Sequence, residues 1–354
     1  MVMSAKWLIL ALALPLAAQQ AVKTGTLKDI PIRDPFILAD DKTKTYYLYA
    51  SAGARETGQP RGGLKAYKSK DLVSWEGPHI TCVLPENFWG GPKGGSAVAP
   101  EVHLYKGRYY LFGTFQNSNR RTKSKVFEDW REAYREGEYN PVKGTQILGS
   151  DSPDGPFLPL ENRLTTPEEF RCLDGTLFVE DGTPYMVFVH SWLQIVDGAM
   201  EAIQLKPDLS ASAGEPFYVF KGSDGPWLKH QTLVRAEPRR YIVDGPFFYR
   251  TKKGRLLMLW SGYKDGEYVA NWKNDKYVQT LAYSESGKLR GPWRQLEPLL
   301  TDDSGHGMVF RAFDGRLIMV VHSPNREAEG LLPGRARLFE MTDTGDTLKI
   351  RKEL

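Results

Sequence analysis

One stretch of the chain decides its fold: residues 173–190, LDGTLFVEDGTPYMVFVH. A small polar phrase, Leu173-Asp174-Gly175-Thr176, opens the stretch and runs into an apolar segment. A turn follows at residues 180–183, and an Asp-Gly pair between two apolar runs is a strong signal for a β-hairpin. The second apolar run, Tyr185 to Phe188, completes the pattern. The stretch therefore predicts two antiparallel strands joined by a tight turn.

The same pattern occurs five times along the chain. Its polar marker residue stands at positions 34, 101, 174, 244 and 306, which are 62 to 73 residues apart. Self-similarity at a nearly fixed period indicates a repeat architecture, and units of three or four antiparallel strands are typical of propeller blades. Third strands are expected at 63–67, 199–205 and 278–283. The opening phrases are Arg33-Asp34-Pro35-Phe36, Ala99-Pro100-Glu101-Val102, Leu173-Asp174-Gly175-Thr176, Val243-Asp244-Gly245-Pro246 and Gly305-His306-Gly307-Met308.

We therefore predict an all-β fold, a five-bladed β-propeller with blades of three to four antiparallel strands. After a signal peptide at about residues 1–20, residues 21–354 form this single domain. A pair of β-sandwiches is the competing interpretation, but it would not require a constant period. The charged and aromatic segment 124–137 is predicted to be a helical excursion or an irregular surface loop of the second unit.

The composition agrees with a folded protein rich in turns. The 354 residues include 34 Gly and 23 Pro, and 12% are aromatic, which excludes disorder. The net charge of +4 comes from 47 basic and 43 acidic residues without a basic block, so nucleic acid is not an expected partner. Cys82 and Cys172 are too few for a disulfide framework. They form one bond or remain two buried thiols, and we favour the thiols.

The N-terminus resembles an export signal. Lys6 precedes an apolar run from Trp7 to Leu16, and small residues follow at 17–21. The run is shorter than the roughly 20 residues of a membrane span but fits the apolar core of a signal peptide. A buried N-terminal helix is the alternative. We predict a secreted or periplasmic protein with no membrane span in the mature chain.

The five marker residues are the candidate chemistry. The innermost strands of a propeller line one axial channel, so Asp34, Glu101, Asp174, Asp244 and His306 are expected to meet at one face. A single Asp before Gly or Pro is explained by turn formation, but five such sites in register favour a function. Clustered carboxylates raise one another's pKa, so one can stay protonated while another is ionised. Glycoside hydrolysis requires such a pair.

Taken in order, the five phrases resemble glycoside hydrolase family 43 over roughly residues 29–345. The resemblance implies a five-bladed propeller that hydrolyses arabinofuranosides, xylosides or galactans of plant-type polysaccharides with inversion. At matching positions it implies that Asp34 is the general base and that Asp174 orients the acid and raises its pKa. His306 becomes the axial histidine, associated with a calcium ion held through water. No cofactor is required for catalysis, and a structural calcium is the one ion implied.

The general acid is where the chain departs from the family. The family usually has Glu before Gly-Pro in the fourth unit, whereas this chain has Asp244, which is one methylene shorter. Some members have Glu in a His-Glu-Trp sequence, whereas this chain has His190-Ser191-Trp192. A serine cannot donate a proton as a carboxylic acid does. We predict Asp244 as the acid, roughly 6.5–9.5 Å from Asp34 as inversion requires, and Ser191 as a pocket residue.

The predicted function is that of an exported glycosidase that removes terminal sugars, foremost α-L-arabinofuranose, from an oligo- or polysaccharide. The alternatives are a catalytically impaired carbohydrate-binding propeller, suggested by Ser191 and the short Asp244, and a β-xylosidase or β-galactosidase of the same fold. A protein-interaction propeller would leave the carboxylates unexplained. The oligomeric state stays open. Candidate substrate-binding residues are Glu101, Ser191, Trp192, Arg311, Phe36 and Trp89. Core packing is the favoured alternative for Phe36, and an ordinary surface position is an equally good alternative for Arg311.

Overall fold

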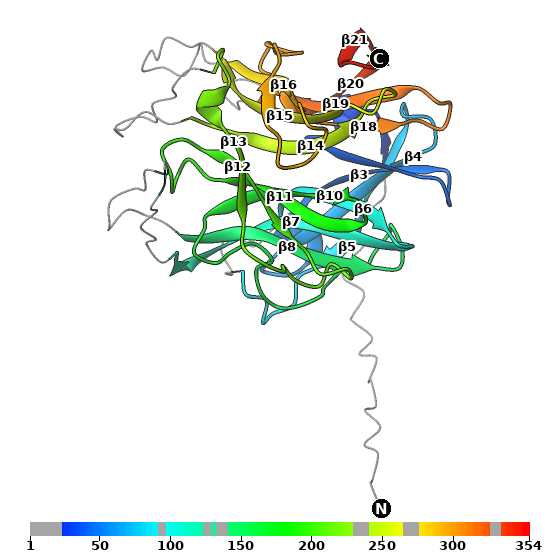
Figure 1. Cartoon of the computed structure of the whole chain (residues 1–354). Helices are drawn as coiled ribbons and strands as arrows, with labels where there is room; N and C mark the ends of the chain where they lie inside the picture. Colours follow the sequence, from blue (N-terminus) through cyan, green and yellow to red (C-terminus); the bar gives the residue numbers. More distant parts are fainter. Residues whose placement is uncertain are drawn as a thin grey trace, which may run out of the picture.

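The computed structural model describes residues 23–90, 97–122, 129, 131, 141–228, 241–264, 276–325 and 334–354. These residues form five antiparallel sheets that follow one another along the chain as the blades of a β-propeller (Figure 1). The predicted all-β fold class is thereby confirmed. The predicted signal at 1–20 lies outside the described residues, as does the segment 124–137 apart from residues 129 and 131.

Each blade begins with its innermost strand and proceeds outward. The inner strands β2, β6, β10, β14 and β18 contact one another in a closed ring around the axis. Blade 1 carries an additional strand, β1, on its outer edge beside β5. The strands of blades 1 and 2 are β1 (Lys23–Gly25), β2 (Phe36–Asp40), β3 (Thr45–Ala52), β4 (Gly63–Ser69), β5 (Trp75–Val83), β6 (Val98–Tyr105), β7 (Arg108–Arg121), β8 (Pro141–Ser150) and β9 (Leu158–Pro159).

Blades 3 to 5 have four strands each, at the upper end of the predicted number. Short helices, η1 (Leu27–Asp29), α1 (Ala54–Thr57) and η2 (Gly222–Asp224), connect some of the elements. The strands are β10 (Cys172–Glu180), β11 (Thr183–His190), β12 (Ala199–Gln204), β13 (Phe217–Lys221), β14 (Asp244–Arg250), β15 (Leu256–Lys264), β16 (Lys276–Ser284), β17 (Trp293–Gln295), β18 (Gly305–Arg311), β19 (Leu317–Ser323), β20 (Arg335–Asp343) and β21 (Leu348–Glu353).

The predicted hairpins join the first and second strands of the blades. Asp181 and Gly182 have φ values of 49° and 80°, and Lys106 and Gly107 have values of 49° and 82°. Two successive residues with positive φ make a type I′ turn, whose twist matches that of the paired strands. The predicted third strands correspond to β4, β12 and β16. The local turn chemistry therefore decides where each pair of strands begins and ends.

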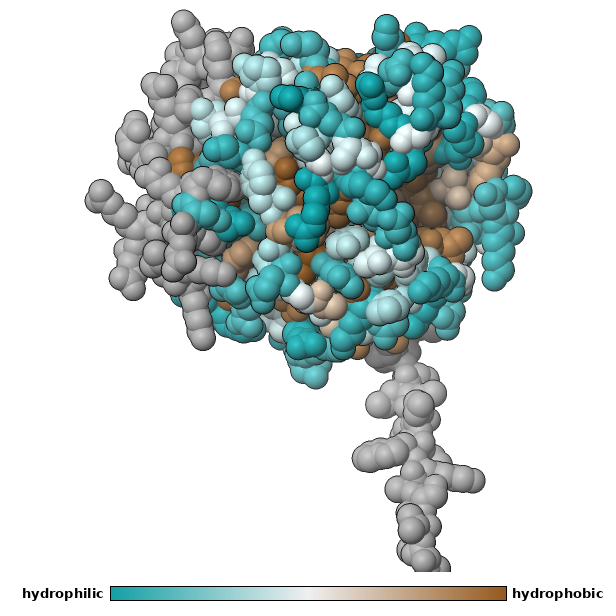
Figure 2. All heavy atoms as spheres, in the orientation of Figure 1, coloured by the Kyte–Doolittle hydropathy of each residue, from teal (hydrophilic) through white to brown (hydrophobic). Residues whose placement is uncertain are grey.

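Neighbouring blades pack face to face through apolar side chains. Phe112 of β7 and Phe188 of β11 belong to one fully buried cluster, and Leu259 of β15 and Met319 of β19 belong to another. Polar residues cover most of the molecular face in Figure 2, with apolar residues visible between them. The five sheets are thus held around the axis by apolar contacts between blades.

Among the described strands, blade 5 and blade 1 share none where the ring closes. The Ile32 amide donates a hydrogen bond of 2.8 Å to the Gly334 carbonyl, and Arg335 Nε donates one of 2.8 Å to the Lys28 carbonyl. The Arg33 guanidinium donates to both the main-chain and side-chain oxygens of Asn325, each at 2.6 Å. Residues just before Asp34 therefore carry the closure of the propeller.

Both cysteines are free and buried, which confirms the favoured interpretation. Cys82 lies in β5 and Cys172 in β10. Burial raises the pKa of the Cys82 thiol to about 12, and it raises the pKa of the Cys172 thiol well above the ordinary value. In the described part of the chain, no helix has both the length and the apolar composition needed to cross a bilayer.

Candidate active site

The five openers share one backbone conformation. Asp34, Ala99, Asp174, Gly245 and His306 all have φ between 47° and 52°, the left-handed region, and we call them the left-handed positions. In blades 2 to 5 the pairing of the first two strands shifts by one residue there, as between Leu173 and Thr176. In these four blades the inner strand therefore starts with a bulge.

This register corrects the alignment that the sequence indicated. Asp34, Asp174 and His306 are equivalent, but the equivalent residues of blades 2 and 4 are Ala99 and Gly245. Asp244 stands one residue before its left-handed position, and Glu101 stands two residues after its own. The five marker residues are thus not five copies of one position.

Gly245 is required by its neighbour as well as by its backbone. Its φ is +51°, and a Cβ at this residue would lie 2.9 Å from the His306 ring. A side chain would therefore displace His306. The absence of one lets the imidazole approach the carboxylates.

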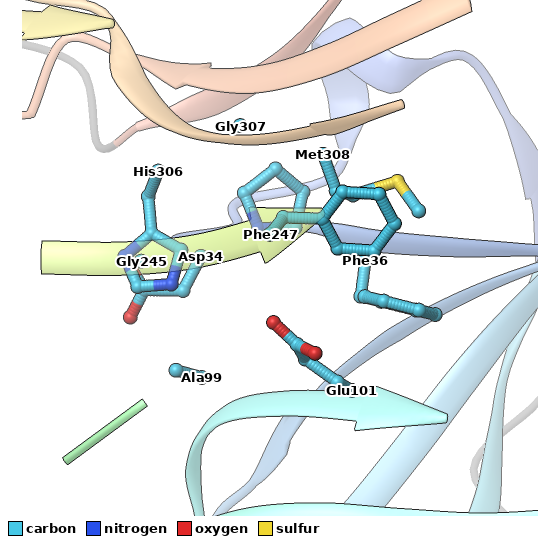
Figure 3. Close-up of a pocket in the computed structure, with 10 residues that line it drawn as sticks. Asp34, Phe36, Ala99, Glu101, Gly245, Phe247, His306, Gly307 and Met308 are labelled. Carbon is cyan, nitrogen blue, oxygen red and sulfur yellow. The ribbon is translucent and has the colours of Figure 1, made fainter. Parts of the chain in front are cut away.

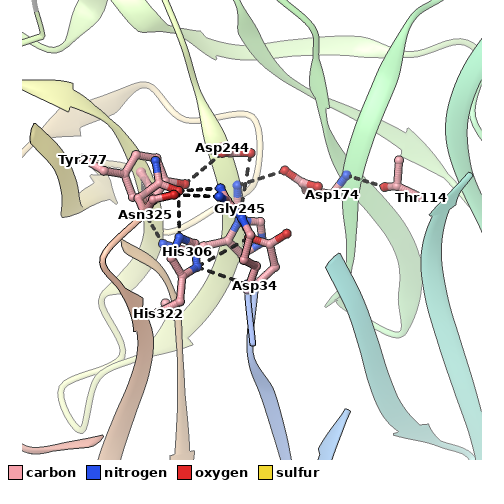
Figure 4. A network of polar contacts seen from close by, with 12 residues as sticks. Asp34, Thr114, Asp174, Asp244, Gly245, Tyr277, His306, His322 and Asn325 are labelled. Atoms are coloured by element: carbon pink, nitrogen blue, oxygen red, sulfur yellow. Dashed lines mark hydrogen bonds and ion pairs between the residues drawn. The ribbon is translucent and has the colours of Figure 1, made fainter. Parts of the chain in front are cut away.

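The structure brings Asp34, Asp174, Asp244 and His306 together at one end of the axis (Figure 4). His306 Nδ1 lies 3.2 Å from Oδ1 of Asp34 and 4.0 Å from Oδ1 of Asp244. Both carboxylates therefore lie within 4.0 Å of the same imidazole, and their separation of roughly 6.5–9.5 Å stays a prediction. The side chains of Asp34 and Asp244 keep 21% and 23% of their exposure, whereas Asp174 keeps 5% as a residue. Asp34 and Asp244 can therefore reach a ligand that Asp174 cannot.

Glu101 separates from this group. Its Oε2 lies 2.8 Å from Nε2 of His103. Glu101 also borders a cavity of about 10 Å³ on the axis, together with Asp34, Phe36, Phe247 and Met308 (Figure 3). A volume of this size holds about one water molecule and no sugar ring.

Asp34 is kept ionised by its surroundings. Burial alone would raise its pKa, but electrostatic interactions with His306, His322, Arg33 and Lys143, in that order, bring the pKa below the ordinary value of 3.8. A carboxylate that holds no proton at neutral pH can accept one. Asp34 is therefore suited to act as a base.

The pKa of Asp174 is shifted in the opposite direction to that of Asp34. Burial is the main cause that raises its pKa well above 3.8, followed by the charge of Asp244 and a hydrogen bond between the two side chains. Two carboxyl groups so close cannot both ionise easily, so the pair titrates as a unit and retains one proton. The site thus combines an ionised carboxylate with a proton-bearing pair, the combination that glycoside hydrolysis needs.

The amides of the left-handed positions are bound by the preceding blade. Asp174 donates to Thr114 Oγ1 at 2.8 Å, His306 donates to Ser261 Oγ at 2.8 Å, and the Asp34 amide donates to His322 Nδ1 at 3.1 Å. We call Thr114, Ser261 and His322 the inter-blade acceptors. They occupy equivalent places, because each is the strand partner of the residue that precedes the left-handed position of its own blade.

Blade 3 lacks an inter-blade acceptor. The equivalent residue is Val189, the partner of Leu173, and it has no atom that can accept a hydrogen bond. The Gly245 amide instead faces Oδ2 of Asp174 at 3.4 Å. The carboxyl group of Asp174 therefore lies between the Asp244 side chain and the amide that follows it.

The residue after each left-handed position follows a related rule. Where it is Gly, a third-strand side chain accepts its amide: Gly175 donates to Thr145 Oγ1 at 3.0 Å, and Gly307 donates to Gln279 Oε1 at 2.6 Å. Where it is Pro, there is no amide hydrogen to satisfy. The equivalent third-strand residues are then apolar: Leu64, Met200 and Ala336 facing Pro100, Pro246 and Pro35.

Three residues of the site were not found from the sequence. Lys143 of β8 is charge-coupled to Asp34, Asp174 and Asp244, and burial is the main cause that lowers its pKa. Tyr277 of β16 donates a hydrogen bond of 2.8 Å to Oδ2 of Asp244, and His322 of β19 is the acceptor for Asp34. All three lie in second or third strands, outside the repeated opening phrases. For His322 the available signal was a histidine near the end of an otherwise apolar strand.

Other predicted binding residues lie in different surroundings. Ser191 is fully buried: its amide donates to the Arg171 carbonyl, and its hydroxyl accepts the Leu193 amide. Trp192 is partly buried against the apolar cluster of blades 3 and 4. Trp89 packs beside Phe115 in the core, with its indole Nε1 bound to Gln146. Ser191 therefore shapes a turn rather than presenting its hydroxyl to a ligand.

The prediction for Arg311 needs correction. Arg311 ends β18, whereas His306 begins it, so five residues of extended chain, about 16 Å, separate them. Arg311 Nη1 donates to the Gly315 carbonyl within its own hairpin at 3.1 Å. A position five residues along a strand is at the opposite end of the blade, so Arg311 does not join the site.

A metal ion is the other candidate occupant of the site. One ligand atom each of Asp174, Asp244 and His306 lies within 4.8 Å of the others, and His306 Nδ1 makes no hydrogen bond of good geometry among the described residues. A bound cation would itself lower the pKa of Asp174, so the raised pKa of this side chain does not decide between a proton and an ion. A calcium ion held through water at His306 stays a prediction, and no step below uses it.

Several solved structures are similar to this chain. An endo-arabinase from Bacteroides thetaiotaomicron VPI-5482 is 34% identical, with a TM-score of 0.74 over 91% of this chain and 98% of that one. An endo-1,4-beta-xylanase from the same organism is 19% identical, with a TM-score of 0.62 over 94% and 97%. An exo-1,5-alpha-L-arabinanase from a bovine ruminal metagenomic library is 16% identical, with a TM-score of 0.57 over 91% and 97%. The latter two show the fold alone. A search of curated proteins found no match.

The sequence profile of glycosyl hydrolases family 43 matches residues 29–343. The matched span begins before Asp34 and ends after His322, so it includes every residue of the site described above. It also includes all five inner strands. The protein is thus a glycosidase that hydrolyses O-glycosyl bonds, and the chain belongs to family 43 of the glycosyl hydrolases.

Proposed function

We propose that the enzyme hydrolyses α-L-arabinofuranosyl bonds at chain ends with inversion, with Asp34 as base and Asp244 as acid. One arrangement carries this proposal: Asp34 and Asp244 both lie beside the His306 imidazole, and the surroundings lower the pKa of Asp34 and raise that of Asp174. The imidazole lies within 3.2 Å of Asp34 and 4.0 Å of Asp244. The role of base thus falls to the ionised Asp34, and the role of acid falls to the pair that holds a proton.

Asp34 performs the first half of the displacement. A water molecule bound to its carboxylate attacks the anomeric carbon and transfers one proton to Asp34. The charges that lower the pKa of Asp34 keep it ready to accept that proton at neutral pH. Its backbone is held by the preceding blade, so the carboxylate has a fixed direction.

Asp244 performs the other half. As the bond between the anomeric carbon and the leaving oxygen breaks, the proton of the Asp174–Asp244 pair passes to that oxygen. Asp244 is the member of the pair that keeps exposure, and Asp174 is the buried member that shares the proton. The bound water supplies the hydroxyl of the released sugar. Asp34 gains one proton in the reaction and the pair loses one. Release of a proton by Asp34 to solvent and uptake of a proton by the pair then restore the site.

The choice of sugar rests on similarity. The structure at 34% identity is described as an endo-arabinase, and it is matched over nearly the full length of both chains. This supports arabinose as the sugar, and cleavage at chain ends is the part of the proposal that experiment has to distinguish from cleavage within the chain. β-Xylosides and β-galactosides are the substrates to compare. We also propose that segment 1–20 directs export of the enzyme. Detection of the enzyme in the secreted or periplasmic fraction would test this.

The decisive variant is Asp34→Asn, assayed on nitrophenyl α-L-arabinofuranoside and on α-1,5-linked arabino-oligosaccharides. Asn tolerates the left-handed conformation and keeps the amide that bonds His322, so the fold should survive. We expect kcat to fall about 10²–10⁴-fold, the usual contribution of a general base. Asp41→Asn, an exposed carboxylate at the far end of the same hairpin, is the control.

Other outcomes assign the alternatives. Unchanged turnover by Asp34→Asn would reject Asp34 as the base. Binding of arabino-oligosaccharide by calorimetry without cleavage of any glycoside in the panel would indicate a binding propeller. Proton NMR of the first-formed sugar reports inversion or retention directly. End-labelled oligosaccharides separate release of single sugars from cleavage within the chain.

A further inference from the structure

The geometry points to a positioning residue, His322: its neutral imidazole accepts the Asp34 amide and so fixes the direction of the Asp34 carboxylate. This inference rests on the proposed role of Asp34 as base. His322 lies at the end of β19 and is completely buried. It is not itself a catalytic residue, because its Nδ1 is 3.5 Å from the Asp34 carboxylate and hydrogen-bonds the backbone instead.

The repeat shows what this position does. Thr114, Ser261 and His322 pair with Val98, Asp244 and Gly305, the residues before the left-handed positions of their own blades. Each of the three accepts the amide of the left-handed residue in the next blade. Three of five blade boundaries use the same contact, so the His322 contact is part of the architecture. Only at the boundary before Asp34 is the acceptor an imidazole.

The tautomer of His322 follows from its partners. Nδ1 accepts the Asp34 amide, so this nitrogen carries no proton. Nε2 must then carry the proton and donate to Oδ1 of Asn325 at 2.8 Å. Asn325 presents that oxygen because its Nδ2 donates to the Tyr263 hydroxyl at 2.6 Å. Arg33 donates to the same Asn325 oxygen at 2.6 Å, so the atom that faces His322 Nε2 is an oxygen, which can only accept.

The ring plane of His322 is also fixed. The Tyr277 ring stacks on it with centroids 5.6 Å apart and planes 14° apart. Tyr277 donates its hydroxyl to Asp244 (Figure 4). One stacked pair of rings therefore supports the backbone of the base and the carboxylate of the acid. This arrangement lies where the first and last blades meet without sharing any of the described strands.

His322 acts on Asp34 by holding its backbone in place and not by exchanging a proton with it. Asp34 has a φ of 48°, a conformation that L-residues other than glycine adopt rarely and that needs support from its surroundings. Without an acceptor its buried amide would lose a hydrogen bond, and the start of the strand could relax. The carboxylate would then move relative to the acid. Such a change should lower kcat more than it raises KM.

The other blades supply matched variants. His322→Val copies blade 3, where Val189 cannot accept, and His322→Ser copies blade 4, where Ser261 reaches the next amide at 2.8 Å. We expect His322→Val to lower kcat about tenfold, as loss of one buried hydrogen bond would, with KM changed less than twofold. His322→Ser should recover most of that loss. Equal kcat in the two variants, or wild-type kcat in His322→Val, would overturn the proposal.

A second measurement can be made on the wild-type protein. Proton–nitrogen NMR of the histidine side chains distinguishes the two neutral tautomers, and His322 should show a bare Nδ1 and a protonated Nε2. A protonated Nδ1 would overturn the proposal whatever the kinetics show. The same spectrum of Asp34→Asn should keep the signature, since the amide remains. If Asp34→Asn proves fully active, the proposed function fails while the His322 signature stands, so the two failures are separable.

Discussion

The hydroxyl of Tyr277 donates a hydrogen bond of 2.8 Å to Oδ2 of Asp244, across two strands of the same blade. Burial is the main cause that raises the pKa of Tyr277 well above 10, so the hydroxyl keeps its proton and always acts as the donor. This contact leaves Oδ1 of Asp244 facing His306 at 4.0 Å. The Asp244 side chain is thus held in one orientation by a hydroxyl group that keeps its proton.

Replacing Tyr277 by Phe should slow the enzyme without unfolding it. The ring would still stack on His322, but Asp244 would lose its donor and its orientation. We expect kcat to fall about tenfold, the effect of one hydrogen bond to a charged group. Tyr283→Phe, on the same strand, is the control. Equal loss of kcat in both variants would show that the Asp244 contact is not the cause.

Activity should follow a bell-shaped pH profile with limbs of known origin. On the acid side it should fall once Asp34 is protonated, below the ordinary value of 3.8, because neighbouring charges lower its pKa despite burial. On the alkaline side it should fall once Asp174 loses its proton, well above 3.8, because burial and Asp244 raise its pKa. The measurement is kcat/KM against pH, which reports the free enzyme.

Asp174→Asn tests the origin of the alkaline limb. Asn cannot titrate and removes the neighbouring charge, so the proton is left to Asp244 alone. The alkaline limb should then move to lower pH, and kcat should fall about 10²–10⁴-fold. A nitrophenyl leaving group needs little protonation, so the remaining activity stays measurable. An alkaline limb at its original pH in Asp174→Asn would place the proton on another group.

The repeat made the fold predictable, but it concealed the register. The opening phrases and hairpin turns are local signals, and five copies of them predict the blades. Alignment by charge placed Asp244 and Glu101 beside Asp34, whereas the backbone aligns Gly245 and Ala99 with it. A glycine at a left-handed position carries no charge, so a search for polar markers passes over it. The one-residue offset of Asp244 could be seen only in the strand pairing.

The supporting residues were harder to predict for a different reason. Lys143, Tyr277 and His322 act on carboxylates through contacts made by second and third strands, some of them across blade boundaries. Such contacts depend on how the blades pack, which no single phrase encodes. One signal existed in the chain: Gly175 and Gly307 face polar third-strand residues, whereas Pro35, Pro100 and Pro246 face apolar ones. Reading it requires the strand register first.

A stability prediction concerns the contact between blades 1 and 2. The Tyr109 hydroxyl donates to Oδ1 of the buried Asp40 at 2.5 Å, and Thr43 donates twice to Oδ2. Tyr109→Phe should lower the free energy of unfolding by about 1.5–3 kcal/mol, the range for a hydrogen bond to a charged group. Tyr105→Phe is the matched control, because its buried hydroxyl has no partner among the described residues and its removal should cost nothing. Equal losses in urea unfolding would contradict this account.

The same contact has a pH dependence with a defined sign. Burial would raise the pKa of Asp40, but hydrogen bonds from Thr43 and Tyr109 bring it below 3.8. A carboxyl group with a lowered pKa in the folded state stabilises the protein above its unfolded pKa and loses that contribution as the pH falls through its folded pKa. The difference in stability between wild type and Tyr109→Phe should therefore shrink below about pH 4. A difference that is constant down to acid unfolding would show that Asp40 is not ionised.

The last prediction concerns Lys143, whose charge is one of those that lower the pKa of Asp34. Lys143→Met removes that charge, so Asp34 should hold its proton to higher pH and the acid limb of kcat/KM should move upward. Lys143→Arg keeps the charge and should leave the limb near its original place. The test is the pH dependence of kcat/KM for the three proteins on one aryl glycoside, because this quantity reports the free enzyme. An unmoved limb in Lys143→Met, or an equal shift in both variants, would show that Lys143 acts on Asp34 through packing and not through charge.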